Sequence, residues 1–294
     1  MSRGDGYVLV TGSSGLVGSE LCKLLEKNGT RFIAADRTQA KPAVSWDTKI
    51  VDLTRNLGDE LPEIDTVFHC AARIPQAGDQ FQECADLNRK IDEVVAKFIA
   101  ERGVRKLVFA STTNLYGASA DLISEQSELH IDNAYAAGKL ESERMFASIE
   151  SVSTFLLRLN APYGPSQRHR TVLSTFIERA RASQDIEYHG TGSRSQDFTH
   201  AGDVASAFVK CIESDSMGGT FNVSSGSPIS MKSLAELIVS LIPESKSEIR
   251  PSNQPDPQEH QRAIFDVSKA GNELGWSPSI SLRDGISDWL AIRR

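Results

Sequence analysis

The sequence predicts an α/β fold, in which a doubly wound parallel sheet is followed by a smaller C-terminal lobe. In the first half of the chain, short apolar runs alternate with longer stretches that have helical apolar spacing. This alternation is typical of parallel strands whose connecting helices cover both faces of a sheet. After residue 160, turn-rich segments and shorter helices replace the pattern. We therefore expect a sheet domain over 1–160 and a lobe over most of 161–294, with a helix and a strand near 203–223 returning to the sheet.

The expected elements of the first half follow from apolar periodicity and from the turn residues between the runs. Strands are predicted at 7–11, 31–35, 49–52, 66–70, 106–111 and 154–160. Helices are predicted at 15–28, 80–102 and 133–149. The apolar stripe of the 80–102 helix predicts a side that faces the core or a second subunit.

Shorter elements are expected in the second half. Helices are predicted at 171–182, 203–213 and 230–242, strands at 186–189 and 220–223, and a loop from Pro251 to Pro257. Ser268 is expected to cap a short helix that Gly275 ends, and a final amphipathic helix contains Leu282 and Trp289.

Composition and charge narrow the functional classes. Lys and Arg total 32 against 39 Asp and Glu, a net charge of −7 without long runs of either sign, so nucleic acid is not an expected partner. No stretch resembles a signal peptide or reaches membrane-spanning length, so we expect a cytoplasmic protein without a membrane partner. The 4 cysteines lack metal-ligand spacing and are expected to be reduced, buried thiols, with no metal bound.

A glycine-rich turn, TGSSGLVG at 11–18, joins the first predicted strand to an amphipathic helix. In such a turn Gly12 permits the tight bend, Gly15 lets the backbone approach a pyrophosphate, and Gly18 lets the helix pack closely on the strand. The free N–H groups and the positive end of the helix dipole then hold the phosphates. The alternative is a plain connection between strand and helix. The motif indicates a dinucleotide site if a ribose-binding carboxylate follows it.

Asp36 supplies that carboxylate, because it ends the next predicted strand about 20 residues after the glycines. A carboxylate there accepts hydrogen bonds from the adenosine ribose and would repel a 2′-phosphate. The pattern therefore favours NAD over NADP, a preference that Arg37 weakens without reversing. The alternative for Asp36 is an ordinary turn residue.

Tyr135 and Lys139 lie four residues apart on the helix predicted at 133–149. At this spacing the two Cβ atoms are about 5–6 Å apart. A tyrosine acts as a base near neutral pH only if its pKa falls from about 10 to about 7, a change that corresponds to about 4 kcal/mol. A cation about 4 Å away supplies a free energy of about this size. The pair is a candidate proton-transfer device, although helices also carry such pairs on their surface by chance.

Ser111, Thr112 and Thr113 end the strand predicted at 106–111, where open α/β sheets bind their ligands. A hydroxyl here can hydrogen-bond a substrate oxygen while Tyr135 removes or returns its proton. The alternative role is capping of the turn that follows.

In combination, these motifs resemble the extended short-chain dehydrogenases/reductases, the NAD-dependent epimerase/dehydratase family, and within it the proteins like UDP-glucose 4-epimerase. The resemblance covers nearly the whole chain and implies a Rossmann-type sheet, NAD as cofactor, a small-molecule substrate and a homodimer formed through helices 80–102 and 133–149. It rests on TGSSGLVG, Asp36, Asp52, HCAA (69–72), Asn88, STTNLYG (111–117), YAAGK (135–139), RLNAPYGP (158–165) and FDVSKAGNELGW near the C-terminus.

The resemblance also implies residue roles. Tyr135 would be the general acid/base, Lys139 would lower its pKa and bind the nicotinamide ribose, and Thr112 would orient the reacting hydroxyl. Asp36 would contact the adenosine ribose. The other implied cofactor contacts are Gly12, Ser14, Gly15, Leu16, Val17, Gly18, Arg37, Asp52, Leu53, Cys70, Ala71, Ala72, Arg73, Asn88, Ser111 and Pro162. The expected substrate contacts are Thr113, Asn114, Asn160, Arg194, His200 and Arg262.

Two departures from the family pattern bear on the substrate. Relatives that dehydrate deoxynucleotide sugars carry an acidic pair where this chain has Thr113 and Asn114, so dehydration is disfavoured. Relatives that bind nucleotide diphosphate sugars commonly carry arginines where this chain has Gln196 and Gln254. A guanidinium can reach a phosphate from a neighbouring position. The candidate replacements are Arg194, Arg250 and Arg262.

The leading hypothesis is an NAD-dependent sugar-modifying enzyme that transfers hydride at a hydroxyl-bearing carbon, with a nucleotide-sugar epimerase as the best guess. The alternative enzyme is a dehydrogenase or reductase of a free sugar, a sugar acid or another small hydroxyl compound. A third hypothesis is an NAD-binding regulatory or scaffold protein, because the same fold can hold a dinucleotide without catalysis. The loops at 73–87, 161–200 and 250–262 are expected to choose the substrate.

Overall fold

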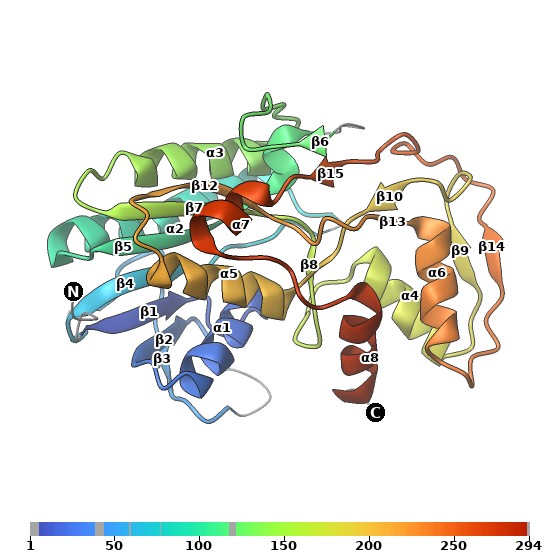
Figure 1. The fold of residues 1–294 in the computed structure, drawn as a ribbon, viewed down its shortest axis with the longest axis horizontal. Helices are drawn as coiled ribbons and strands as arrows, with labels where there is room; N and C mark the ends of the chain where they lie inside the picture. Colours follow the sequence, from blue (N-terminus) through green and yellow to red (C-terminus); the bar gives the residue numbers. More distant parts are fainter. Residues whose placement is uncertain (1–5, 39–43, 59, 77, 118–121, 293–294) are drawn as a thin grey trace.

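The computed structural model describes residues 6–38, 44–58, 60–76, 78–117 and 122–292. Its centre is a seven-stranded parallel sheet with the strand order β12-β7-β5-β4-β1-β2-β3 (Figure 1). The strands are β1 (Tyr7–Thr11), β2 (Phe32–Asp36), β3 (Thr48–Ile50), β4 (Ile64–His69), β5 (Lys106–Thr112), β7 (Ser153–Leu159) and β12 (Gly218–Val223). The predicted doubly wound, Rossmann-type sheet is confirmed, and its order reverses between β1 and β4. Ligands of such sheets bind at that reversal, beyond the carboxyl ends of the strands.

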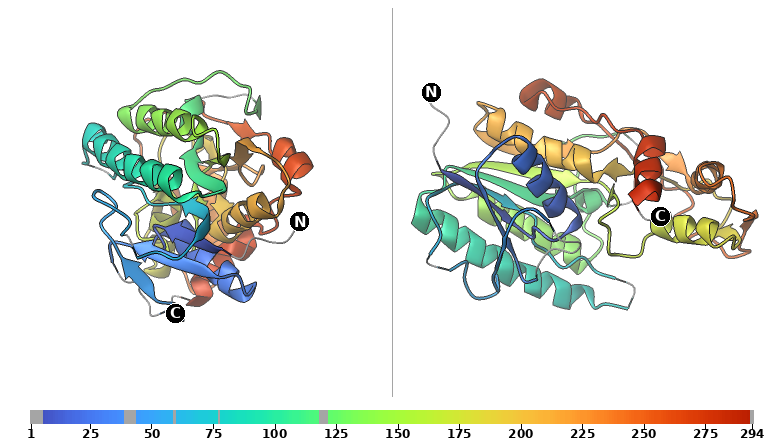
Figure 2. Two further views of the ribbon diagram at one scale, coloured as in Figure 1. Left: turned by 90° about the vertical axis from the view of Figure 1, so that its left-hand side faces the viewer. Right: turned by 90° about the horizontal axis from the view of Figure 1, so that it is seen from below.

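Helices cover both faces of the sheet (Figure 2). Because side chains alternate along a strand, Val8 and Val10 of β1 pack in the core under α1 (Leu16–Lys27) and α5 (Ala201–Glu213). Leu9 points the other way, into the core under α2 (Phe81–Arg102) and α3 (Ala134–Ala147). The sheet is therefore buried on two sides.

The start of α3 is fixed by a side-chain cap. Asn133 has extended backbone angles, and its Oδ1 accepts a hydrogen bond of 2.9 Å from the N–H of Ala136. Such a cap contributes about 1 kcal/mol to a helix. It places Tyr135 and Lys139 in the first two turns of α3, which packs against β5.

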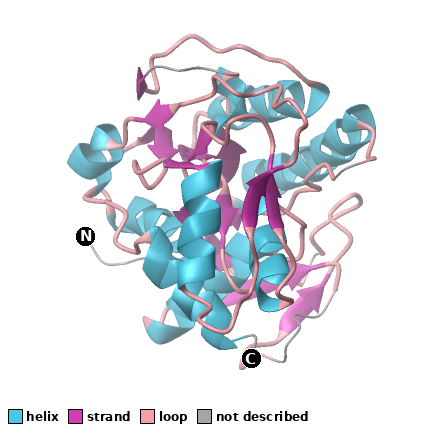
Figure 3. Ribbon diagram, turned by 90° about the vertical axis from the view of Figure 1, so that its right-hand side faces the viewer, coloured by secondary structure: helices cyan, strands magenta, loops and turns pink. Residues whose placement is uncertain are grey.

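The lobe contains the helices α4 (Val172–Arg181), α6 (Met231–Ser240) and α8 (Leu282–Ile292) (Figure 3). They pack around a separate apolar core that includes Phe176 and Trp289. Short paired strands join its loops. These pairs are β9 (Ile186–Tyr188) with β14 (Ile249–Pro251), β10 (Ser195–Gln196) with β13 (Ile229–Ser230), β8 (Pro162–Tyr163) with β11 (Thr199–His200), and β6 (Leu122–Ile123) with β15 (Ile264–Phe265). A 3₁₀ turn, η1 (Thr113–Tyr116), follows β5.

Two local predictions were wrong. Pro251, expected to begin a loop, is the last residue of β14 and pairs with Tyr188. Ser268, expected to cap a helix, is instead the first residue of α7 (Ser268–Leu274), and its N–H donates to Oδ1 of Asp266 at 2.9 Å. Gly275 ends α7 as predicted, with φ of +64°. Among the described residues, no helix is both long and apolar enough to span a membrane.

Candidate active site

A cavity of about 640 Å³ lies at the carboxyl edge of the sheet, between the sheet and the lobe. The sheet side contributes the glycine turn, Thr112 at the end of β5, and Tyr135 and Lys139 of α3. The lobe contributes Arg170 and other polar side chains. Residues that are far apart in the sequence therefore share one site.

The glycine turn is built as the motif predicts. Gly12 has φ of +69°, and a Cβ there would lie 2.7 Å from the backbone nitrogen of Ala71. A Cβ on Gly18 would lie 2.2 Å from the carbonyl oxygen of Gly12. Both positions exclude a side chain because backbone segments of the protein pack closely there. A Cβ on Gly15 would lie 3.1 Å from the carbonyl oxygen of Gly12, and Gly15 lines the cavity, where its backbone can approach a ligand. The residues present thus fit a bound pyrophosphate.

Asp36 ties the end of β2 to this turn. Its Oδ2 accepts a hydrogen bond of 2.9 Å from the N–H of Ser14, and its Oδ1 accepts one of 2.7 Å from the N–H of Arg37. The hydroxyl of Ser14 in turn donates to the carbonyl of Thr38 at 2.8 Å. The carboxylate that the sequence analysis assigned to the ribose lies beside the glycine turn, where a dinucleotide would pass.

Tyr135, Lys139 and Thr112 come together as predicted, and all three are nearly buried, with exposed fractions of 7%, 3% and 8%. Nζ of Lys139 donates to the carbonyl of Ala110 at 3.0 Å and lies 4.3 Å from the ring centroid of Phe109. Oγ1 of Thr112 accepts from the N–H of Asn114 at 3.1 Å, so Thr112 also caps η1.

The electrostatic expectation for Tyr135 was wrong in sign. Burial raises the pKa of Tyr135 far above its usual value, and the negative charge of Asp92 raises it further. Burial also lowers the pKa of Lys139, against the opposing effect of Asp92. Helical spacing predicts that the two residues meet, but it carries no information about how deeply both are buried.

Several expected contacts support the site from behind. Asn88 clamps the loop after β4, because its Oδ1 accepts from the N–H of Arg73 at 2.7 Å and its Nδ2 donates to the carbonyl of Arg73 at 3.0 Å. Ser111 donates to Glu143 at 2.5 Å, and Glu143 also binds the guanidinium of Arg158 at 2.8 Å. These residues hold the cavity wall in place.

Thr113 and His200 are likewise occupied within the protein. The hydroxyl of Thr113 donates to Oδ1 of Asn160 at 3.1 Å, so Thr113 positions a residue that does line the cavity. Nδ1 of His200 accepts from the N–H of Gly202 at 3.1 Å and caps α5. His200 lies outside the cavity lining, as does Arg262, which is exposed. The role of both residues as substrate contacts stays a prediction.

The cofactor contacts expected from the sequence divide into two groups. Those that line the cavity are Gly12, Gly15, Leu16, Val17, Gly18, Cys70, Ala72, Ser111, Tyr135, Lys139 and Pro162. Those outside its lining are Ser14, Asp36, Arg37, Asp52, Leu53, Ala71, Arg73 and Asn88. Asp52 follows β3, which ends at Ile50 rather than at 52, and its carboxylate accepts from the hydroxyl of Thr54 at 2.7 Å.

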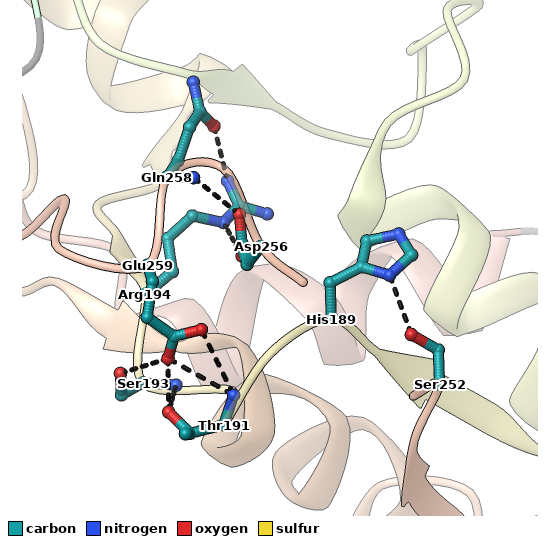
Figure 4. Close-up of polar contacts among 8 residues, drawn as sticks. All are labelled: His189, Thr191, Ser193, Arg194, Ser252, Asp256, Gln258 and Glu259. Atoms are coloured by element: carbon teal, nitrogen blue, oxygen red, sulfur yellow. Dashed lines mark hydrogen bonds and ion pairs between the residues drawn. The ribbon is translucent and has the colours of Figure 1, made fainter. Parts of the chain in front are cut away.

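The lobe holds Arg194 at the cavity through residues of a distant loop (Figure 4). Nε of Arg194 donates to Oδ2 of Asp256 at 2.9 Å, and Nη1 donates to Oε1 of Gln258 at 3.3 Å. Glu259 of the same loop accepts from the hydroxyl of Ser193 at 2.7 Å. These contacts fix the segment that carries Arg194 against residues more than 60 positions away.

The other proposed arginine replacements do not reach the cavity. Arg250 pairs with Asp185 at 3.0 Å and with Glu187 at 3.2 Å, outside the lining. Arg170, which the sequence analysis missed, does line the cavity. It follows the turn-rich segment after β8, where no periodicity indicates the direction of a side chain.

Comparisons with known proteins agree with this architecture. The model of the NAD dependent epimerase/dehydratase family matches residues 8–224. The chain therefore belongs to this family, whose members are extended short-chain dehydrogenases/reductases, and the predicted cofactor NAD is confirmed for it.

Individual relatives have different activities. An uncharacterised UDP-glucose epimerase of Bacillus subtilis (strain 168) is 26% identical over 97% of this chain and 96% of its own. The dTDP-D-glucose 4,6-dehydratase of Mus musculus is 28% identical over 77% of this chain and 67% of its own. The solved structure of MoeE5 in complex with UDP-glucuronic acid and NAD is 27% identical, with a TM-score of 0.87, and the match covers 98% of this chain and 100% of MoeE5.

Proposed function

We propose that this chain is an NAD-dependent enzyme that oxidises a hydroxyl-bearing carbon of a nucleotide sugar, with Tyr135 as the acid/base. The observation that carries the proposal is the meeting of Thr112, Tyr135, Lys139 and the glycine turn around one cavity. A regulatory protein that only holds a dinucleotide has no need for a buried phenol beside a buried ammonium.

NAD, when bound, accepts the hydride from the carbon and can return it. Tyr135 takes the hydroxyl proton as the carbonyl forms and returns it in the reverse step. Thr112 holds the substrate oxygen toward Tyr135, and the charge of Lys139 stabilises the phenolate that results. The N–H groups of the glycine turn hold the phosphates, while Asp36 faces the adenosine ribose.

The side of the cavity that the lobe forms, here called the lobe wall, favours a substrate with anionic groups. Arg170 and Arg194 line it, and a guanidinium binds phosphate oxygens with paired hydrogen bonds. Gln196, which stands where an arginine is common in relatives, offers amide donors without charge. The nucleotide sugars named for MoeE5 and for the Bacillus relative have this chemistry.

We favour epimerisation over net dehydrogenation of a free sugar or sugar acid, because of the likeness to a UDP-glucose epimerase. The likeness to a dehydratase gives no support to our expectation that dehydration is disfavoured. That expectation rests only on Thr113 and Asn114, which offer no acidic pair at the end of β5.

One assay separates the candidate reactions. The protein is incubated with NAD and a panel of nucleotide sugars, free sugars and sugar acids, while the absorbance of NADH and the identity of the product are followed. An epimerase converts a nucleotide sugar without accumulating NADH, whereas a dehydrogenase releases one NADH per product. Loss of water from the sugar would show a dehydratase, and no conversion of any substrate would contradict an enzymatic role.

A further inference from the structure

A buried polar network lies behind the helix that carries Tyr135 and Lys139. Asp92 of α2 has no exposed surface, and its Oδ1 lies 2.8 Å from Nε2 of His69 at the end of β4. Its Oδ2 accepts a hydrogen bond of 2.5 Å from the hydroxyl of Ser142 on α3. Nδ1 of His69 lies 2.7 Å from Oγ1 of Thr11, which ends β1. The network thus links the start of the glycine turn to the catalytic helix.

The partners in this network define an arrangement of protons. Nε2 of His69 donates to the carboxylate of Asp92, because a carboxylate only accepts. Nδ1 of a neutral ring then accepts from the hydroxyl of Thr11, whose oxygen in turn lies 3.4 Å from the N–H of Ala71. In this arrangement the carboxylate of Asp92 accepts two hydrogen bonds, one from His69 and one from Ser142.

Lys139 needs a counter-charge, because an isolated buried ammonium ion loses its proton. It is 3% exposed, and its hydrogen bond goes to a neutral carbonyl. Two carboxylates act on its charge. Asp92 of α2 is hydrogen-bonded to Ser142, which lies three residues after Lys139 on α3, and Glu143 lies one turn after Lys139 on the same helix. Glu143 is already neutralised by Arg158 of β7, through contacts of 2.8 and 3.0 Å.

The remaining titratable neighbours carry no charge near neutral pH. Burial raises the pKa of the Cys70 thiol, which faces Lys139 from the end of β4. The pKa of the Cys84 thiol, which faces Tyr135 from α2, is also raised by burial. Among the described residues that act on the Tyr135–Lys139 pair, Asp92 is therefore the carboxylate that has no arginine in an ion pair with it.

We propose that Asp92 is the buried counter-charge of the Lys139 ammonium ion, and that His69 and Ser142 are positioning residues that hold its carboxylate in place. The importance of Asp92 for turnover rests on the proposed function. Its effect on the charge of Lys139 does not depend on that function. Asp92 opposes the lowering of the Lys139 pKa by burial and adds to the raising of the Tyr135 pKa. Asp92 accordingly favours the protonated form of both groups.

The test is Asp92→Asn, which keeps the shape of the side chain and removes its charge. Loss of a negative charge lowers the pKa of Lys139, so we expect the lysine to lose its proton at a pH about one unit lower than in the wild type, a tenfold change in its ionisation constant. The measurement is an NMR pH titration of protein with ¹³C-labelled lysine, without cofactor or substrate. The Lys139 resonance is assigned by its absence from Lys139→Met.

Asp86→Asn is the matched control, because Asp86 is a half-exposed carboxylate on the same helix, bound to Arg89 at 3.5 Å. It should leave the Lys139 titration where it is in the wild type. If Asp92→Asn does not fold, Ser142→Ala takes its place, with a smaller shift in the same direction because the carboxylate loses a hydrogen bond. A Lys139 titration that does not move in the folded variant overturns the proposal.

Turnover gives a second measurement. In Asp92→Asn the alkaline decline of kcat, where Lys139 loses its proton, should move to lower pH, with little change in KM. Because the NMR titration involves no reaction, a Lys139 shift without any turnover would support the counter-charge and count only against the proposed function.

Discussion

The sheet edge and the lobe wall enclose the same cavity but are built by different means. At the sheet edge, the shape depends on the backbone, with Gly12 and Gly18 at positions where a Cβ would collide. At the lobe wall, the shape depends on side chains from distant loops, such as Arg194 held by Asp256. A substitution at the sheet edge therefore disturbs the backbone, whereas a substitution at the lobe wall removes a side-chain contact.

The largest effect is expected at the backbone-built edge. In Gly18→Ala the new Cβ would lie 2.2 Å from the carbonyl oxygen of Gly12, so the turn must open. We expect NAD affinity to fall by about 100-fold or more, because the N–H groups no longer converge on the phosphates. Isothermal titration with NAD measures this. Gly271→Ala in α7, where a Cβ would lie 3.6 Å from the carbonyl oxygen of Trp276, is the control that should bind NAD normally.

A smaller and different effect is expected at the lobe wall. Arg194→Ala should raise KM for a nucleotide sugar by about 10- to 100-fold, because the substrate loses a charge-assisted hydrogen bond. The affinity for NAD should stay unchanged. Asp256→Asn should raise KM less, because the guanidinium remains but loses its ion pair. Steady-state kinetics of both variants measure these changes in KM. If KM is unaltered in Arg194→Ala, the lobe wall does not hold the anionic group through this residue.

The smallest effect concerns cofactor choice at the end of β2. Asp36→Ala removes the charge that would repel a 2′-phosphate, so the preference for NAD over NADP should fall by about tenfold. The ratio of the two dissociation constants measures it. Asp36 also accepts a hydrogen bond of 2.9 Å from the N–H of Ser14. Asp36→Asn is therefore tested as well, because the amide oxygen of asparagine can accept the same hydrogen bond and keep the turn folded. An unaltered ratio in both would remove Asp36 from the ribose site.

The contrast between the sheet edge and the lobe wall also explains which features of the site could be predicted from the sequence. The strands, the glycine turn and the Tyr135–Lys139 pair follow from local spacing, and the structure places them together. The sequence did not show that His200, Arg250 and Arg262 lie outside the cavity lining, because the short strands β11 and β14 and the loop around Arg262 are too short for periodicity to indicate side-chain direction. Arg170 was missed for the same reason.

The spacing of residues along the sequence also did not predict how deeply their side chains are buried. The pKa of Tyr135 is raised by burial and by the negative charge of Asp92. Asp92 had a sequence signal, since Asn88 and Asp92 are polar residues four positions apart on a helix whose buried side is otherwise mostly apolar. Polar residues at such positions are usually hydrogen-bonded in the core, and here they support the site.

The most direct test of the account is the reaction of Tyr135→Phe with NAD and the substrate that the wild type converts. Removal of the phenolic hydroxyl should lower kcat by about 10³-fold, the usual contribution of a general acid/base, while NAD affinity stays within about twofold of the wild type. Tyr188→Phe, on β9 and outside the cavity lining, is the control and should react as the wild type does. Turnover by Tyr135→Phe at the wild-type rate would contradict the central claim that this phenol moves the proton.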